Sequence, residues 1–183
     1  MMGSYGIFLR KFLSAPSKIG SVMPSSKYLT AKMFATVDWD TTTAIAELGA
    51  GTGVFTELIA QKKHLDAKAV IIEQDPVMRE NLIHRFPSLC FGSQAENLPF
   101  ILRKLGLEKV DCIISGLPFA VFDKSLRGKI LQAAYDSLRE GGTFIAFQYS
   151  PQMYLAFKRR FANVQLGFEA RNLPPAIVYR CTK

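Results

Sequence analysis

The stretch ELGAGTGVFT, residues 47–56, places three glycines between an apolar run and a helical pattern. Glycines let the backbone turn tightly and approach a ligand without Cβ clashes. Their spacing is GxGxG, because Val54 stands where the dinucleotide-binding fingerprint has its third glycine. Glu47 would repel a phosphate but suits a positively charged ligand. The turn therefore predicts a site for a cationic ligand; the alternative is that the glycines only pack helix against strand.

A second acidic residue ends the next apolar run, IIEQDP, about 20 residues further on. A carboxylate at this place, Glu73, can accept hydrogen bonds from both hydroxyls of a ribose. The two acids and the turn together predict a ligand with a nucleoside and a cation but no phosphate. S-adenosylmethionine, which carries adenosine, a sulfonium and an ammonium, fits this description.

Apolar runs and helical patterns alternate from residue 43 onward. Runs typical of strands cover 42–48, 67–73, 88–93, 110–116, 142–149, 163–170 and 176–182. Helical periodicity covers 53–63, 76–86, 97–105 and 123–140, which Gly141 and Gly142 end, and a short helix is expected at 151–161. This order predicts an α/β fold: a doubly wound, Rossmann-like, seven-stranded, mostly parallel sheet with helices on both faces. The last two strands should form a reversed, antiparallel pair.

The amino terminus carries a basic, amphipathic pattern. Residues 5–13 place aromatic and leucine side chains at helical spacing, beside basic residues, and Pro16 ends the pattern. Such a helix suits a membrane interface, or it packs on the domain itself. A cap helix should begin near Ser25 and Ser26, where N–H groups could receive a lipid phosphate or a serine could act as N-cap. We expect an N-terminal helical extension over 1–37 and one domain over 38–183.

The net charge of +8 is unevenly distributed. Residues 1–37 contain five basic residues and no acidic one, and residues 158–183 contain six basic residues against Glu169 alone. This predicts an anionic partner, either nucleic acid or a lipid surface. Three cysteines without CxxC spacing and two isolated histidines predict no metal site. The same cysteines, read as small core residues, indicate a reducing, cytoplasmic setting. The chain shows no apolar run long enough to cross a bilayer and no signal-peptide pattern.

Residues 40–183 resemble the class I S-adenosylmethionine-dependent methyltransferases. In that family the residue matching Glu47 helps to hold the methionine amino group, the glycine-rich backbone lines methionine and ribose, and the residue matching Glu73 holds the ribose. An acidic residue usually accepts from the adenine amino group; here the matching residue is Gln94, and Glu96 is an alternative. The resemblance implies a cofactor-binding set of Glu47, Gly49, Ala50, Gly51, Thr52, Gly53, Glu73, Gln74, Gln94, Ala95 and Ser115, with S-adenosylhomocysteine as the product.

The fourth strand ends in SGLPF, residues 115–119, where Pro118 cannot continue a central strand because it has no N–H. Class I enzymes that methylate amino nitrogens keep an Asn/Asp-Pro-Pro-Tyr-like motif there. Gly116 stands at the asparagine position of the similar ribosomal RNA adenine dimethyltransferases. We expect the backbone carbonyls of Ser115, Gly116 and Leu117 and the ring face of Phe119 to meet the substrate amine. The alternative places Phe119 in the core.

Four stretches in order, GSVMPSSKYLTAKM (20–33), ELGAGTGVFT, SGLPF and RNLPPAIVYR (171–180), are similar to the bacterial phospholipid N-methyltransferases. This resemblance implies stepwise methylation of phosphatidylethanolamine by a cytoplasmic protein on the inner face of the membrane, with an anionic membrane surface and no nucleic acid as partner. Ser25, Ser26, Tyr149, Asn172 and Tyr179 are the expected substrate-binding residues. An RNA adenine N6-methyltransferase, whose positive charge would contact phosphates, stays an alternative. So does a cofactor-binding peripheral membrane protein without catalysis.

Overall fold

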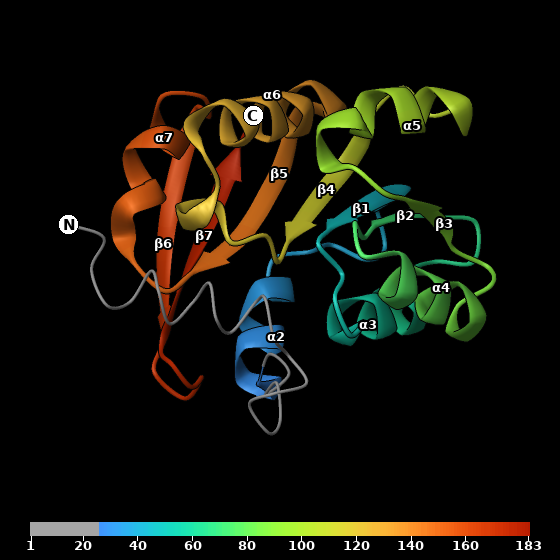
Figure 1. Ribbon diagram of the computed structural model, residues 1–183, viewed down its shortest axis with the longest axis horizontal. Coiled ribbons are helices and arrows are strands. Elements are labelled where there is room, and N and C mark those ends of the chain that lie inside the picture. The colour runs from blue at the N-terminus through green and yellow to red at the C-terminus, as the bar shows by residue number, and fades with distance from the viewer. Residues whose placement is uncertain (1–25) are drawn as a thin grey trace.

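A seven-stranded mixed sheet runs through the computed structural model, which describes residues 26–183 (Figure 1). The strands are β1 (Ala44–Leu48), β2 (Lys68–Ile72), β3 (Cys90–Gly92), β4 (Val110–Ser115), β5 (Leu138–Gln148), β6 (Asn163–Glu169) and β7 (Ala176–Thr182). Their order is β3-β2-β1-β4-β5-β7-β6. The first five are parallel, and β7 runs antiparallel to both β5 and β6. The predicted doubly wound fold with a reversed terminal pair is thereby confirmed.

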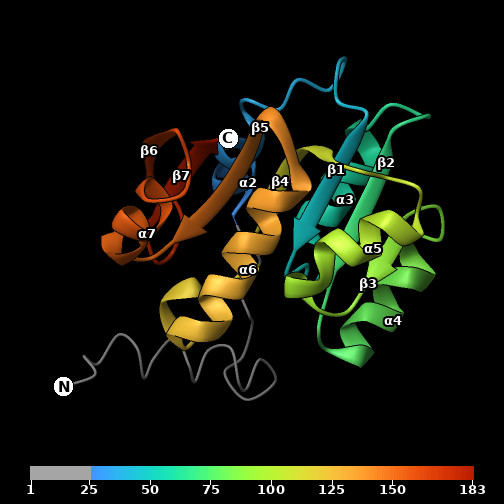
Figure 2. The ribbon, with the colours of Figure 1, turned by 90° about the horizontal axis from the view of Figure 1, so that it is seen from above.

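Helices cover both faces of the sheet (Figures 1 and 2). They are α2 (Lys27–Phe34), α3 (Val54–Lys62), α4 (Pro76–Arg85), α5 (Leu98–Lys104), α6 (Lys124–Ser137) and α7 (Tyr154–Lys158), with 3-10 turns η1 (Ala95–Asn97), η2 (Phe119–Val121) and η3 (Pro151–Met153). The helices α2, α3 and α4 pack on one face, and α5, α6 and α7 on the other. The central strands read as continuous apolar runs because both of their faces are buried; Ile113 and Ile114 of β4 are both fully enclosed.

Three of the helices begin at side-chain caps. The oxygens of Ser26, Asp75 and Asp123 accept hydrogen bonds from the backbone N–H groups of Leu29, Met78 and Leu126. Each cap satisfies one of the N–H groups that a helix start leaves without a partner. Ser26 is therefore an N-cap, one of the two roles expected for it. The amphipathic pattern of residues 5–13 and Ser25 lie outside the described residues, and the division at residue 37 stays a prediction.

The predicted helix over 123–140 is wrong at its carboxyl end. It stops at Ser137, and Leu138 already pairs with Val110 of β4. The register then shifts before Cys112, so that the intervening residues of β5 bulge out of the ladder. Gly141 adopts a φ of +72° there. Tertiary contacts override the local helical periodicity here. A sequence pattern does not show such long-range partners, so it predicts too long a helix.

Those contacts centre on Asp111, a partly exposed residue of β4. Its carboxylate accepts from the backbone N–H groups of Thr43 and Ala44 at 2.8 and 2.9 Å, and from Arg139 Nε at 2.5 Å. It thereby joins the start of β1 to the bulge in β5. Burial alone would raise the pKa of this carboxyl, but the hydrogen bonds from Ala44, Arg139 and Thr43 together hold it below its ordinary value.

Replacing this carboxylate should destabilise the fold. We expect Asp111→Asn to lower the free energy of unfolding at pH 7 by about 1–3 kcal/mol, because two backbone donors and a guanidinium lose a charged acceptor. Because the folded-state pKa is depressed, the stabilisation exists above the ordinary pKa of an aspartate and is lost as the pH falls below it. Denaturant unfolding at several pH values measures the difference.

A matched control is Asp66→Asn, since that side chain is 96% exposed. Its effect should stay within about 0.5 kcal/mol. Equal effects of the two substitutions, or a pH-independent effect at Asp111, would contradict the assigned role.

Candidate active site

The carboxyl ends of β1, β2, β4 and β5 meet at one edge of the sheet, called here the carboxyl edge (Figure 2). In a doubly wound sheet, ligands bind at this edge where the strand order reverses. Leu48 at the end of β1 lies opposite Ser115 at the end of β4. The Leu48 carbonyl accepts from the Gly116 N–H at 2.9 Å. The glycine-rich turn and SGLPF therefore leave the sheet side by side.

The glycine-rich turn depends on glycine for its backbone conformation at two positions, and both are closely packed. Gly49 and Gly53 have φ angles of +76° and +89°, which L side chains rarely adopt. A Cβ on Gly49 would lie 2.7 Å from a methyl carbon of Leu117, and one on Gly53 would lie 2.5 Å from a methyl carbon of Leu82. The turn is thus packed between SGLPF on one side and α4 on the other.

Glu73, just beyond the end of β2, is fixed by backbone donors. Its two carboxylate oxygens accept from the N–H groups of Gly51, at 2.7 Å, and Asp75, at 2.9 Å. A carboxylate has about four acceptor positions, so capacity remains for hydroxyl donors. The Gly51 N–H is directed at this acid and is not available to cradle an anion. The arrangement suits a sugar and disfavours a phosphate.

Glu47 is the most unusual charge of the site, because β1 carries it into the interior with no exposed surface. One oxygen accepts from Thr56 Oγ1 at 2.6 Å, whereas Oε1 is buried without a hydrogen-bond partner. Burial raises the pKa of this carboxyl to about 8; the bond from Thr56 opposes the rise, and the charge of Glu73 adds to it. A buried acceptor without a donor is costly, so a cation beside Oε1 would relieve it.

The remaining predicted cofactor residues surround these acids. Ala50 is buried, and the Thr52 carbonyl accepts from Arg85. Gln74 is exposed and Ala95 is buried in the core. The carbonyl oxygen of Gln94 accepts from the Asn97 side chain at 2.7 Å, which leaves its amide NH₂ group for a ligand. The choice between Gln94 and Glu96 as the adenine partner stays open.

SGLPF is held in place by Gln148, a residue that the sequence analysis did not identify. It ends β5, is almost fully buried, and donates from Nε2 to the Leu117 carbonyl at 2.9 Å. The Ser115 hydroxyl oxygen accepts from the Leu117 N–H at 3.3 Å. A glutamine at the end of an apolar strand was the available signal, since buried amides need fixed partners.

Gly116 has a steric reason to be glycine. A Cβ at this position would lie 2.8 Å from the carbonyl oxygen of Gly49, closer than real Cβ contacts allow. The Gly49 oxygen belongs to the backbone, and the position of a Cβ is fixed by its own backbone, so no side-chain rotation relieves the clash. The asparagine of the adenine dimethyltransferases therefore cannot replace Gly116 unless the glycine-rich turn moves.

The ring face of Phe119 is not open to a substrate amine, contrary to the prediction. Its side chain has no exposed surface, and its ring makes edge-on contacts with Phe122, Phe144 and Phe157 at centroid distances of 5.9–6.1 Å. Phe119 is a core residue that anchors the end of SGLPF. The aromatic cluster, which sequence spacing could not show, closes off the face that an amine would need.

Three predicted substrate-binding residues converge near the carboxyl edge. Asn172 Oδ1 accepts from the Ser26 N–H at 3.1 Å. Burial raises the pKa of the Tyr149 hydroxyl, and a hydrogen bond to the Asn172 side chain opposes that rise. Tyr179 lies elsewhere, contrary to prediction: it is fully buried, packs on Phe157 and donates to the Ser150 carbonyl at 3.2 Å. It supports the core.

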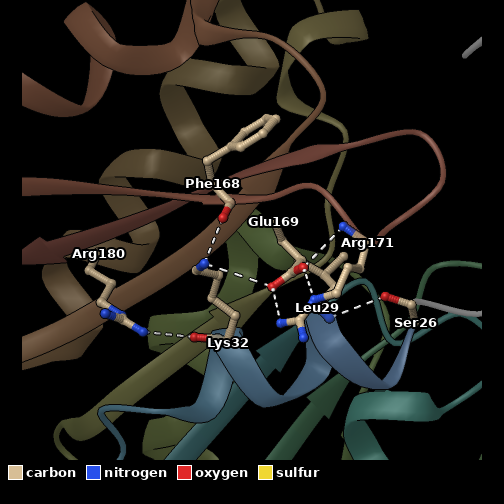
Figure 3. Close-up of polar contacts among 7 residues, drawn as sticks. All are labelled: Ser26, Leu29, Lys32, Phe168, Glu169, Arg171 and Arg180. Carbon is tan, nitrogen blue, oxygen red and sulfur yellow. Dashed lines mark hydrogen bonds and ion pairs between the residues drawn. The ribbon is translucent and has the colours of Figure 1, made fainter.

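An ionic cluster holds α2, and with it Ser26, against β6 and β7 (Figure 3). Arg171 Nε lies 2.9 Å from one oxygen of the buried Glu169, and Lys32 Nζ lies 3.8 Å from the other. Arg180 donates to the Lys32 carbonyl at 2.8 Å. The hydrogen bonds from Arg171, helped by the charge of Lys32, lower the pKa of Glu169 to about 2. The acid therefore stays ionised and paired at neutral pH.

Residues 26–183 contain neither a membrane-spanning helix nor a candidate metal site. None of the helices there has the length and apolar content needed to cross a membrane. No three histidine, cysteine, aspartate or glutamate side chains gather there in a way that could hold a metal ion.

Comparison with known structures supports the fold. An rRNA methylase from Streptococcus thermophilus superposes with a TM-score of 0.63 at 15% identity, over 88% of this chain and 99% of its own. The N-methyltransferase NodS from Bradyrhizobium japonicum WM9, in complex with S-adenosyl-l-homocysteine, gives a TM-score of 0.64 at 13% identity over 78% of each chain.

A relative in sequence shows the family as well as the fold. No protein-family model matches the chain. An ornithine lipid N-methyltransferase from Singulisphaera acidiphila is 35% identical over 98% of this chain and 96% of its own length. Identity at that level over nearly the whole of both chains shows common family membership. The chain therefore belongs to the family of this N-methyltransferase, within the class I S-adenosylmethionine-dependent methyltransferases.

Proposed function

We propose that the enzyme methylates the amino nitrogen of a membrane lipid. Phosphatidylethanolamine and its partly methylated forms are the proposed substrates, and the named substrate of the relative, ornithine lipid, is the second candidate. Both present an amine on a lipid. The observation that carries the proposal is the relationship to a lipid N-methyltransferase over nearly the entire chain. The proposed location is the cytoplasm, peripherally on the inner face of the membrane.

The residues of the carboxyl edge fit S-adenosylmethionine, and we assign to each of them the part of the cofactor that it would hold. Glu47, with its buried and unpartnered Oε1, would hold the methionine ammonium. Glu73 would accept from the ribose hydroxyls, and the turn from Gly49 to Gly53 would line the methionine and ribose. When bound, the cofactor supplies an electrophilic methyl group on a sulfonium. The amine nitrogen would take up this methyl group as the carbon–sulfur bond breaks, and S-adenosylhomocysteine would leave as the thioether.

SGLPF is the proposed position of the amine. The Leu117 carbonyl already accepts from Gln148 and from the Phe119 N–H, whereas no described residue donates to the Gly116 carbonyl. We assign the Gly116 carbonyl, beside that of Ser115, as acceptor for an amine N–H. This alignment, together with exclusion of water, should supply most of the rate, since an unprotonated amine needs no further activation.

The RNA alternative is less well supported. The fold does not decide, because an rRNA methylase shares it. The close approach of Gly116 to Gly49 is the specific feature against it, since the amide of an adenine enzyme has no room there. A binding protein without catalysis is also disfavoured, because the chain is related to an N-methyltransferase over 98% of its length.

Labelled S-adenosylmethionine separates these readings. We expect label to enter phosphatidylethanolamine or ornithine lipid in mixed vesicles and not unmodified ribosomal RNA. Extraction and chromatography of the lipid products would measure it and would rank the two lipids. Label in RNA alone would overturn the proposal, and label in neither would favour a protein that only binds the cofactor.

Cofactor binding should release a proton from Glu47. With its pKa near 8, this carboxyl is mostly protonated at pH 7, and a bound ammonium favours the ionised form. Calorimetry with S-adenosylhomocysteine in two buffers of different ionisation enthalpy should show about one proton more released by the wild type than by Glu47→Gln.

The matched control is Glu57→Gln on α3, whose side chain is 55% exposed. Its proton release should equal that of the wild type. If Glu47→Gln also released the wild-type amount, Glu47 would not be the group that meets the ammonium.

Filling the space at Gly116 should weaken the site. Gly116→Ala forces a Cβ against the Gly49 carbonyl, so we expect a loss of about 1–3 kcal/mol in unfolding free energy and weaker binding of S-adenosylhomocysteine. Gly128→Ala in α6 is the control, because a Cβ there meets nothing within 4 Å. Denaturant unfolding and calorimetry measure both. Wild-type affinity in Gly116→Ala would exclude the tight contact as a requirement of the site.

A further inference from the structure

The edge strand β6 has two faces of different character. Gly167 and Glu169 face α2, where both meet Lys32. The alternate residues therefore point to the other face. There Val164 packs on the core, whereas Leu166 and Phe168 are 53% and 61% exposed. Figure 3 shows the Phe168 ring on the side of β6 away from α2.

Adjoining elements extend this exposed apolar surface. The short helix α7 packs against β6 and carries Leu155, which is 63% exposed. The turn between β6 and β7 carries Leu173, which is 70% exposed. We call Leu155, Leu166, Phe168 and Leu173 the β6 apolar surface. Four large apolar side chains exposed on neighbouring elements exceed the isolated ones that any protein surface shows.

The charges that residues 150–183 place on this side of β6 have one sign. Lys158, at the end of α7, and Arg159, directly after it, are exposed. Arg171 is turned toward α2, where it pairs with Glu169 and lies over the Tyr28 ring. Glu169 is the single acidic residue between positions 150 and 183, and its carboxylate is buried toward α2 and paired. The outward charge beside the β6 apolar surface is therefore cationic. Apolar side chains bordered by cations match the interface of an anionic bilayer.

Position supports the same partner. Because β6 runs parallel to β5, Phe168 lies at the end of β6 that is nearest the carboxyl edge. A second copy adding a strand to β6 is disfavoured, since the Lys32 ammonium already occupies the Phe168 carbonyl at 2.6 Å.

We propose that the β6 apolar surface docks the enzyme on an anionic phospholipid bilayer, so that the carboxyl edge faces the lipid head groups. This inference rests on the proposed lipid substrate. The surface is distinct from residues 5–13, which the sequence analysis singled out as a membrane-binding pattern.

Flotation of the full chain with vesicles of phosphatidylglycerol and phosphatidylcholine tests the docking without any substrate amine. The wild type should float with the vesicles, and less so as salt screens the cations. Leu166→Gln with Phe168→Gln should lower the vesicle partition coefficient about tenfold, because binding scales with the apolar area inserted. Unfolding curves and S-adenosylhomocysteine affinity should match the wild type.

The control pair is Leu65→Gln with Leu105→Gln, two exposed apolar residues outside the β6 apolar surface, and it should float like the wild type. A Leu166/Phe168 variant that also floats like the wild type overturns the proposal, as does a wild type that ignores the vesicles. A wild-type dimer in sedimentation that this variant loses would also overturn it, because the surface would then join two copies.

A second readout separates this inference from the proposed function. The Leu166/Phe168 variant should methylate a water-soluble, short-chain amine lipid at the wild-type rate while its activity on vesicles falls. Equal rates of variant and wild type on vesicles would overturn the docking surface alone. If the wild type methylated no amine lipid in either form, the proposed function would fail whatever the flotation showed.

Discussion

The close approach of two backbones at the carboxyl edge is the constraint on which the site depends. Gly49 and Gly116 leave neighbouring parallel strands. A Cβ on Gly116 would lie 2.8 Å from the backbone carbonyl of Gly49, and one on Gly49 would lie 2.7 Å from a methyl carbon of the Leu117 side chain. The Gly116 N–H also bonds to the Leu48 carbonyl. The two turns pack directly against each other. A shift of either turn would therefore change both the proposed cofactor position and the proposed amine position.

The carboxyl edge also contains a buried acid that lowers the stability of the unliganded protein. A buried Glu47 with a raised pKa makes the unliganded protein less stable as the pH rises through the range between its ordinary and folded values. A protein that only needed a packed core would place an apolar residue there. The cost is understandable if a cationic ligand compensates it. Glu73 differs, because both of its carboxylate oxygens accept from backbone N–H groups.

Much of the fold could be predicted because it follows from local patterns. Apolar runs bounded by turns give the strands of a sheet buried on both faces, and the order of strands and helices gives the crossovers. The errors arose where distant residues decide. The bulge in β5 needs Asp111 and Arg139, which stand 28 residues apart. Phe119 is enclosed by rings of β5 and α7, besides that of the neighbouring Phe122.

The candidate site divides in the same way. Glu47, the glycines and Glu73 lie in two short stretches, so their order alone indicated a shared ligand. Gln148 acts on Leu117 across 31 positions, and Tyr179 reaches the core through a strand whose direction reverses. Ser26, Tyr149 and Asn172 stand far apart in the sequence, and the packing of α2 on β6 and β7 brings them together.

The contrast between Glu47 and Glu169 separates function from architecture. Both are buried acids, but Glu169 is surrounded by Arg171 and Lys32 and its pKa falls, whereas Glu47 meets one hydroxyl and its pKa rises. Glu169 completes an ion cluster that fixes α2 and removes the one negative charge from the basic carboxyl-terminal surface. Glu47 keeps one buried carboxylate oxygen, Oε1, without a hydrogen-bond partner among the described residues. An acid that the fold has not neutralised is the stronger indication of a ligand, because only binding can supply the missing partner.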